Sequence, residues 1–183
     1  MNAYNFWSIF FKGNLMLIPD NQKFMGITYN KIGLILFLIT FSIALFPLIK
    51  TVFKSIKTTL PLAISIEKLL ITGALIPLLF FYFNTQMHER YSHPAFIFLI
   101  TYCILEKKPF IGLIASLAYF LNLEDVLHYF QLSHYGTLIF SYKFVSFLYL
   151  ISIILLFNEL FENRFLKLKK MSEIVSACTI KKN

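Results

Sequence analysis

The chain has 183 residues, of which 58% are hydrophobic, 18% are aromatic and only 14% are charged, and its formal net charge is +8. So few charges are unusual in a soluble domain of this length, and the composition therefore favours a membrane protein. The chain shows no combined basic and aromatic motif typical of RNA or DNA binding, so the positive charge points to anionic lipid headgroups rather than to nucleic acid.

The first 30 residues are expected to lie at the membrane interface rather than within the hydrocarbon. The aromatic side chains of Phe6, Trp7, Phe10 and Phe11 suit a short helix lying flat on the membrane surface. The stretch LIPDNQ that follows is typical of a turn.

Five apolar segments follow, each long enough or nearly long enough to cross a membrane. The clearest is 32–49, which carries no charge, and the second is 60–83, with Glu67 and Lys68 near one end. Three more are short and need flanking aromatic and polar residues to reach across the bilayer: 92–105, 110–123 and 144–157. The expected fold is therefore an all-α, polytopic bundle of about five transmembrane helices over residues 1–170, followed by a tail at 171–183.

The basic residues divide unequally between the two sides that these spans create. Most of them fall on one side, in the segments after the first and third spans and in the carboxyl-terminal segment: Lys50, Lys54, Lys57, Lys107, Lys108, Arg164, Lys167, Lys169, Lys170, Lys181 and Lys182. The positive-inside rule therefore predicts a cytoplasmic carboxyl-terminal tail and an outer amino terminus, with 1–30 as an outer interfacial segment. Because such a segment would have to cross the membrane with no span ahead of it, we expect the chain to be the carboxyl-terminal piece of a longer protein.

A short polar link, NTQMHERYSHP (Asn84–Pro94), joins two of the most apolar segments on the outer side. It does not fit the HExxH zinc motif, because His88 and His93 are five residues apart and would lie about 140° from each other on a helix. We also expect Pro94 to keep His93 out of helical geometry. Neither of the two cysteines is placed for a metal cluster or a disulfide, so no metal site is predicted.

The residue types of this link suit a phosphate at the level of the lipid headgroups. Arg90 offers a planar fork of donors that matches phosphate oxygens, and His88 can add a donor or a cation. Glu89 can orient either of them or balance a metal-bound diphosphate, and Tyr91 can stack on a sugar or lie at the lipid interface. A solvated loop is the alternative, and His93 is expected to be structural or solvated.

The second outer loop carries a further group of polar residues: Asn122, Glu124, Asp125, His128 and His134. These side chains can line a groove for an acceptor, or they can form a polar turn at the interface. Asn122, at the end of a span, is expected to bond backbone rather than sugar.

Three stretches carry a resemblance to a known family. The string MHERYSHPAFIFL (Met87–Leu99) resembles the MHERY-x-x-P signature of bacterial membrane glycosyltransferases with the GT-C fold, relatives of the GPI-anchor mannosyltransferases. NAYNFWSIF (Asn2–Phe10) and MGITYNKIGLILF (Met25–Phe37) resemble the family's Asn-Trp segment and the start of its next span, and SLAYFLNLEDVLHYF (Ser116–Phe130) resembles a late span ending in Phe-x-Asn. In this order they cover most of residues 2–160.

The resemblance implies a transferase that moves a sugar from a polyprenyl-phosphate donor to an acceptor on the outer face of the bacterial cytoplasmic membrane. It implies that His88, Glu89 and Arg90 contact the donor phosphate, with Tyr91 beside them. The family's catalytic carboxylate belongs to an amino-terminal half that has no counterpart here, so the catalytic residues are unknown. No cofactor is expected in this chain, although the full-length family can use a divalent metal.

The expected partners are membrane lipid, the polyprenyl-phosphate donor, and the missing amino-terminal half or another membrane protein. A non-catalytic module that binds lipid phosphate or scaffolds a partner enzyme is the alternative function. A small transporter fits less well, because no charge lies in the middle of a span and no pair of broken helices is evident.

Overall fold

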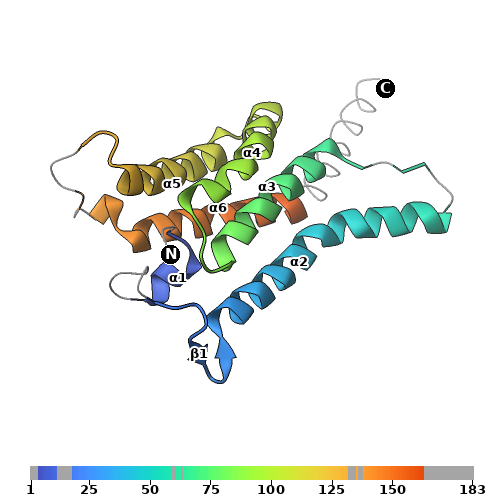
Figure 1. The fold of residues 1–183 in the computed structure, drawn as a ribbon. Helices are drawn as coiled ribbons and strands as arrows, with labels where there is room; N and C mark the ends of the chain where they lie inside the picture. The colour runs from blue at the N-terminus through green and yellow to red at the C-terminus, as the bar shows by residue number, and fades with distance from the viewer. Residues whose placement is uncertain are drawn as a thin grey trace.

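The structure is a computed structural model that describes residues 4–11, 18–58, 61–62, 64–131, 135 and 138–162. Most of these residues are helical (Figure 1), in the elements α1 (Phe6–Phe10), α2 (Tyr29–Thr58), α3 (Ile66–Phe83), α4 (His93–Glu106), α5 (Pro109–Leu127) and α6 (Tyr142–Glu162). Two short 3₁₀ helices, η2 (Glu89–Ser92) and η3 (Leu138–Phe140), lie in the links. A small antiparallel hairpin, β1 (Lys23–Phe24) and β2 (Ile27–Thr28), precedes α2 and departs from the all-α prediction.

Four of the described helices are long and apolar enough to cross a membrane, namely α2, α3, α5 and α6. They support the prediction of a helical membrane protein. The third predicted span, 92–105, corresponds to α4, which has 14 residues and rises only about 21 Å, less than the ~30 Å of a bilayer's hydrocarbon. The described residues therefore contain five helices at the predicted spans, of which four are candidate spans.

The boundaries of the first two spans differ from those predicted. Helix α2 continues to Thr58, past the predicted end at residue 49, because lysine is a good helix former and a charge does not end a helix. Its 30 residues rise about 45 Å, so its last turns reach beyond the hydrocarbon. Beyond Pro47 none of its described side chains is buried, and this half of α2 projects past the other helices (Figure 1). Helix α3 begins at Ile66 rather than at residue 60, after the non-helical Ser65.

Helix α3 lies at the centre of the bundle and packs against α2, α4 and α6, while α5 packs against α4 and α6. Its buried side chains include Ile71, Leu75, Leu78 and Phe81. Successive long helices run in opposite directions, so the links fall at two ends of the bundle (Figure 1). We call one the loop end, which carries α1, the hairpin, the polar link and the described residues between α5 and α6, and the other the lysine end, where α2 and α6 finish and α3 begins.

Helix α1 does not lie flat on the surface as predicted but is built into the loop end of the bundle. Trp7 is only 4% exposed, and its Nε1 donates a 2.8 Å hydrogen bond to the carbonyl of Phe83. The Asn5 side chain caps α1 and donates to the carbonyls of Phe81 and Asn84, at 3.2 and 3.0 Å. The last carbonyls of α3 have no helical partner, and the amino-terminal segment supplies their donors.

The same segment also binds the last two helices. Ser146 of α6 donates a 2.7 Å hydrogen bond to the Asn5 carbonyl, and the Tyr4 amide donates a 3.2 Å bond to Asn122 Oδ1 of α5. The Tyr4 hydroxyl donates to the Asp125 carboxylate. Burial, followed by this hydrogen bond and the charge of Asp125, raises the pKa of Tyr4 well above its ordinary value of 10.0. Residues 4–11 thus hold α3, α5 and α6 together at the loop end.

Candidate functional site

The polar link turns the chain from α3 into α4 by a defined path. Asn84 closes α3, with its Nδ2 donating to the Phe80 carbonyl at 2.9 Å, and Gln86 adopts a left-handed conformation with φ +54°. Met87 is buried, and His88 is extended before η2 begins. The Tyr91 amide then donates a 3.0 Å bond to the His88 carbonyl. The link is therefore a folded turn rather than a loose loop.

The second half of the link is anchored to α5 and α6. Ser92 is fully buried, and its Oγ lies 3.4 Å from the Tyr149 hydroxyl oxygen. A ring nitrogen of His93 is hydrogen-bonded to the Tyr119 hydroxyl, although the His93 side chain is exposed. The expectation that Pro94 keeps His93 out of a helix is wrong: His93 begins α4 with φ −49° and ψ −48°. Proline fits there because the first turn of a helix needs no amide donor at that position.

The part of the chain that the structure describes contains no cluster of possible metal ligands. Nowhere in those ranges do three His, Cys, Asp or Glu side chains gather closely enough to hold an ion. His88 is extended with ψ 154° while His93 is helical, so the two imidazoles do not share a helical face. The link offers hydrogen-bond donors that suit a phosphate, rather than a cluster of metal ligands.

A groove of about 780 Å³ opens beside the link. The link contributes Arg90, Tyr91, His93 and Pro94 to its lining, and the remaining lining residues are apolar side chains of α2 and α3, namely Phe37, Ile76, Pro77 and Phe80. We call it the Arg90 groove. It joins one exposed guanidinium at the loop end to an apolar surface formed by the two helices.

The four predicted site residues do not all face this groove. Arg90 and Tyr91 line it, whereas His88 and Glu89 are absent from its lining. The His88 ring packs edge-on against the Tyr91 ring, with 5.4 Å between the centroids. Glu89 is half-buried on the first turn of η2. The structure therefore brings Arg90, Tyr91 and His88 together and leaves Glu89 beside them.

Sequence analysis predicted neither the apolar wall of the groove nor the position of His93 in its lining. Phe37 lies about 50 residues before the link in the chain, and only the packing of α2 against α3 brings it near. Pro77 lies inside α3, and this proline is the one local signal that the stretch differs from an ordinary span.

The second loop forms a braced turn. Glu124 is only 3% exposed and accepts hydrogen bonds from the Phe130 amide at 2.9 Å and the Tyr135 hydroxyl at 2.5 Å. Asn122 accepts from the Tyr4 amide, which confirms that it bonds backbone. His128 ends α5 in a left-handed conformation with its ring centroid 4.1 Å from that of Tyr135, and His134 lies outside the described residues. These contacts fit the polar turn rather than an acceptor groove.

One acidic residue lies closer to the link than its place in the sequence suggested. The Thr85 hydroxyl donates a 3.4 Å bond to Asp20 Oδ2, so Asp20 sits at the loop end beside the beginning of the polar link. Two predicted spans, 32–49 and 60–83, separate Asp20 from the link in the chain, although Asp20 and the link were both expected on the outer side.

Comparison of the chain with protein-family models, with characterised proteins and with solved structures finds no match. The function is therefore argued from the geometry of the Arg90 groove and its surroundings.

Proposed function

We propose that this chain binds a polyprenyl-phosphate sugar donor, and that it forms the donor-binding part of a membrane glycosyltransferase acting on the outer face of the bacterial cytoplasmic membrane. The isoprenoid chain would occupy the apolar length of the Arg90 groove, with its phosphate at Arg90. The observation that carries the proposal is the meeting of an exposed guanidinium and a 780 Å³ apolar groove at one place on the surface.

The state of Arg90 supports this assignment. Within the described residues the Arg90 guanidinium makes no hydrogen bond or ion pair, so its five N–H donors are available to a ligand. A guanidinium matches two phosphate oxygens at once, and such charge-assisted pairs are about twice as strong as neutral hydrogen bonds. The anchoring of Ser92 and His93 holds the turn that presents Arg90, so little ordering is needed on binding.

The neighbouring side chains have distinct parts in the proposed site. Tyr91, 43% exposed, offers a ring face to the sugar or to the first isoprene unit. His88 packs on that ring and adds a second donor at the phosphate. Glu89 offers a negative charge that can orient Arg90 or His88. Turnover also needs a general base for the acceptor hydroxyl, and we assign none of the residues above to that role.

The orientation of the proposed site follows from the charges of the two ends. The lysine end carries Lys50, Lys54, Lys57, Lys107 and Lys108, and the positive-inside rule would place it in the cytoplasm. The loop end and the Arg90 groove would then face the other side of the membrane, where a translocated polyprenyl-phosphate sugar is presented.

The alternative is a non-catalytic module that binds the same lipid phosphate, or that scaffolds a partner membrane enzyme. Both functions use the same groove, and they differ in turnover. A lipid-binding module holds the donor without consuming it, whereas a transferase releases polyprenyl phosphate when an acceptor is present.

The test is a binding titration of the purified chain in detergent micelles with geranylgeranyl phosphate, with a polyprenyl-phosphate hexose and with uncharged geranylgeraniol. We expect Arg90→Ala to weaken binding of the two phosphorylated lipids at least tenfold, and Arg90→Lys to recover part of the loss. Binding of the alcohol should stay unchanged, because its hydroxyl does not need the guanidinium.

Lys143→Ala is the matched control, since it removes a cation from the loop end without touching the groove. Equal affinities of the wild type and Arg90→Ala for geranylgeranyl phosphate would refute the donor site. Binding that depends on Arg90, with no release of polyprenyl phosphate even when the chain is supplied with membranes of a glycosyltransferase-competent bacterium, would favour the non-catalytic module.

A further inference from the structure

A second pocket, of about 560 Å³, lies at the lysine end, where α2, α3 and α6 meet. Four lysines line it, three from α2 and one from the first turn of α3: Lys50, Lys54, Lys57 and Lys68. The described residues that line it include no carboxylate. We call it the basic pocket, and it is at the opposite end of the bundle from the Arg90 groove.

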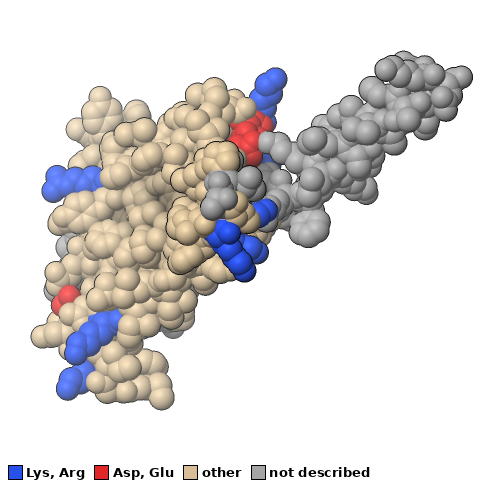
Figure 2. Space-filling model, turned by 90° about the vertical axis from the view of Figure 1, so that its right-hand side faces the viewer, with Lys and Arg blue, Asp and Glu red and all other residues tan. Residues whose placement is uncertain are grey.

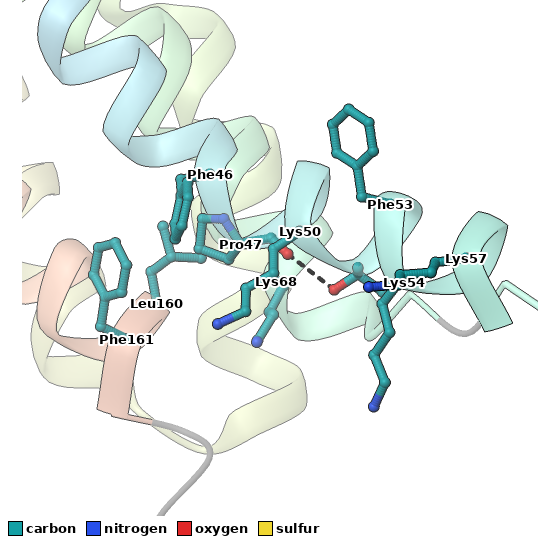
Figure 3. A pocket seen from close by; sticks show the side chains of 10 residues that line it. Phe46, Pro47, Lys50, Phe53, Lys54, Lys57, Lys68, Leu160 and Phe161 are labelled. Atoms are coloured by element: carbon teal, nitrogen blue, oxygen red, sulfur yellow. Dashed lines mark hydrogen bonds between the residues drawn. The ribbon is translucent and has the colours of Figure 1, made fainter.

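The three lysines of α2 share one face of the helix. They are spaced four and three residues apart, which places them in a row about 10 Å long. Lys68 adds a fourth positive charge from the neighbouring helix, and Figure 3 shows lysine side chains from both helices extending into the same region. A row of this length exceeds the width of a single phosphate group and suits two phosphates side by side.

None of these four lysines forms an ion pair with another residue in the part of the chain that the structure describes. Lys108, at the same end of the bundle, differs in this respect because it is paired with Glu159. Like charges held together on one helix face repel one another, so the arrangement favours an anion brought from outside. Figure 2 shows one group of Lys and Arg side chains near the centre of this face, others spread around its edge, and few acidic side chains.

The other wall of the basic pocket is apolar. Phe46 and Pro47 of α2 and Leu160 and Phe161 of α6 line it, and Phe46 and Phe161 are exposed at 56% and 47% (Figure 3). A soluble anion gains nothing from such a wall, whereas a lipid lays its acyl chains against it.

The depth of the pocket agrees with that of a lipid headgroup. Lys50 lies about 32 Å along α2 from Tyr29, which is about one hydrocarbon thickness from the start of the helix. Lys54 and Lys57 lie further out, and Phe46 lies a turn further in. Charge is thus placed where phosphates lie and apolar surface where acyl chains begin.

We propose that the basic pocket binds an anionic phospholipid, with its phosphates on the lysine row and its acyl chains against Phe46, Leu160 and Phe161, and that it prefers a lipid with two phosphates. The site is separate from the donor site and does not depend on it. Its occupant would hold the projecting half of α2 against α3 and α6.

The test is native mass spectrometry of the full chain in detergent, titrated with cardiolipin, phosphatidylglycerol and phosphatidylcholine. We expect cardiolipin to bind more tightly than phosphatidylglycerol, and phosphatidylcholine to bind weakest. The triple variant Lys50→Gln, Lys54→Gln and Lys68→Gln should lose at least tenfold in cardiolipin affinity. Thermal unfolding of each variant checks that it is folded.

The matched control removes the same number of charges from the loop end, as Lys23→Gln, Lys31→Gln and Lys143→Gln, and should change cardiolipin affinity less than twofold. Equal losses in the two triple variants would overturn the proposal, because net charge alone would then explain binding. Equal affinity for phosphatidylcholine would overturn it too, and this measurement needs only the wild type. Displacement of cardiolipin by an equal concentration of glycerol phosphate would show a soluble-anion pocket instead.

Discussion

The two ends of the bundle use polar residues in opposite ways. At the loop end, polar side chains form hydrogen bonds within the protein. For example, the Asn5 side chain accepts from the Trp7 amide and donates to two carbonyls at the end of α3. At the lysine end, the four cations of the basic pocket have no partner among the described residues. In a membrane, backbone groups at a helix end need partners, so polar residues that meet this need are structural. Polar residues that form no such bonds are available to bind ligands.

The same difference divides the polar link itself. Ser92 and His93 are bonded to tyrosines of α6 and α5, and they fix the turn. The side chains of Arg90 and His88 make no hydrogen bond within the described residues and are exposed. The hydrogen-bonded residues Ser92 and His93 hold Arg90 and His88 in place, which is the arrangement that a preorganised binding site requires.

The largest expected effect comes from breaking the close packing at the loop end. A Cβ atom on Gly33 would lie 2.5 Å from the Phe83 carbonyl oxygen, the atom that also accepts the Trp7 indole bond. We therefore expect Gly33→Val to lower the free energy of unfolding by about 3 kcal/mol, measured by titration with SDS in mixed micelles. Trp7 is the only tryptophan, and its emission should shift to the red as its 4%-exposed ring meets solvent.

Leu34→Val is the control, because Leu34 neighbours Gly33 in the chain but its side chain is 48% exposed. It should change the free energy of unfolding by less than about 0.5 kcal/mol. If the two variants behaved alike, α2 would not be held against the end of α3 by this contact.

Sequence analysis predicted the helical segments well because their signal is local. Runs of apolar residues such as 110–123 and 144–157 lie within α5 and α6 and differ only at the boundaries. The hairpin at Lys23–Thr28 was missed because its strands have two residues each, too few to show an alternating pattern. The length of α2 was missed because lysines were taken to end a span, although they do not end a helix.

The sites were less predictable, since they depend on packing between distant segments. The residue types around Arg90 indicated phosphate binding, but the apolar groove beside it is formed by side chains of α2 and α3. The aromatic character of residues 6–11 indicated an interfacial helix, yet the cap formed by Asn5 and the indole bond of Trp7 draw this helix into the bundle. Composition alone does not distinguish an aromatic ring facing lipid from one facing a neighbouring helix.

A smaller, pH-dependent effect is expected from Tyr4→Phe, which removes the hydroxyl bonded to Asp125. At pH 8 the loss should be about 1 kcal/mol of unfolding free energy. In the unfolded chain this tyrosine ionises near its ordinary pKa of 10.0, whereas burial and Asp125 keep it protonated in the folded chain. Rising pH therefore favours the unfolded state of the wild type, and its advantage over Tyr4→Phe should shrink above about pH 10.

Unfolding titrations of both chains at pH 8, 9, 10 and 11 measure this difference, and comparing the two cancels the titration of other groups. Tyr129→Phe serves as the control, because Tyr129 is 78% exposed, and it should leave the free energy at pH 8 unchanged. A gap between wild type and Tyr4→Phe that stayed constant up to pH 11 would mean that burial and Asp125 do not raise the pKa of Tyr4 in the folded chain.

The smallest effect has the opposite sign and belongs to the lysine end. Lys54 is exposed and lies four residues from Lys50 on the same face of α2, so the two charges repel. In detergent without anionic lipid and at low salt, we expect Lys54→Gln to raise the free energy of unfolding by about 0.3 kcal/mol. The gain should vanish at ~1 M salt, where charges are screened within about 3 Å.

Lys108→Gln, at the same end, should lower stability by about 0.5 kcal/mol, because Lys108 is paired with Glu159 at a partly exposed position. The sign of the change therefore separates a cation bound to the protein from a cation left for a ligand. If Lys54→Gln destabilised the chain as Lys108→Gln does, the lysine row would be part of the internal bonding, and the two ends of the bundle would not differ in kind. A stabilising change means that the fold holds these charges together against their own repulsion, as a site for anions does.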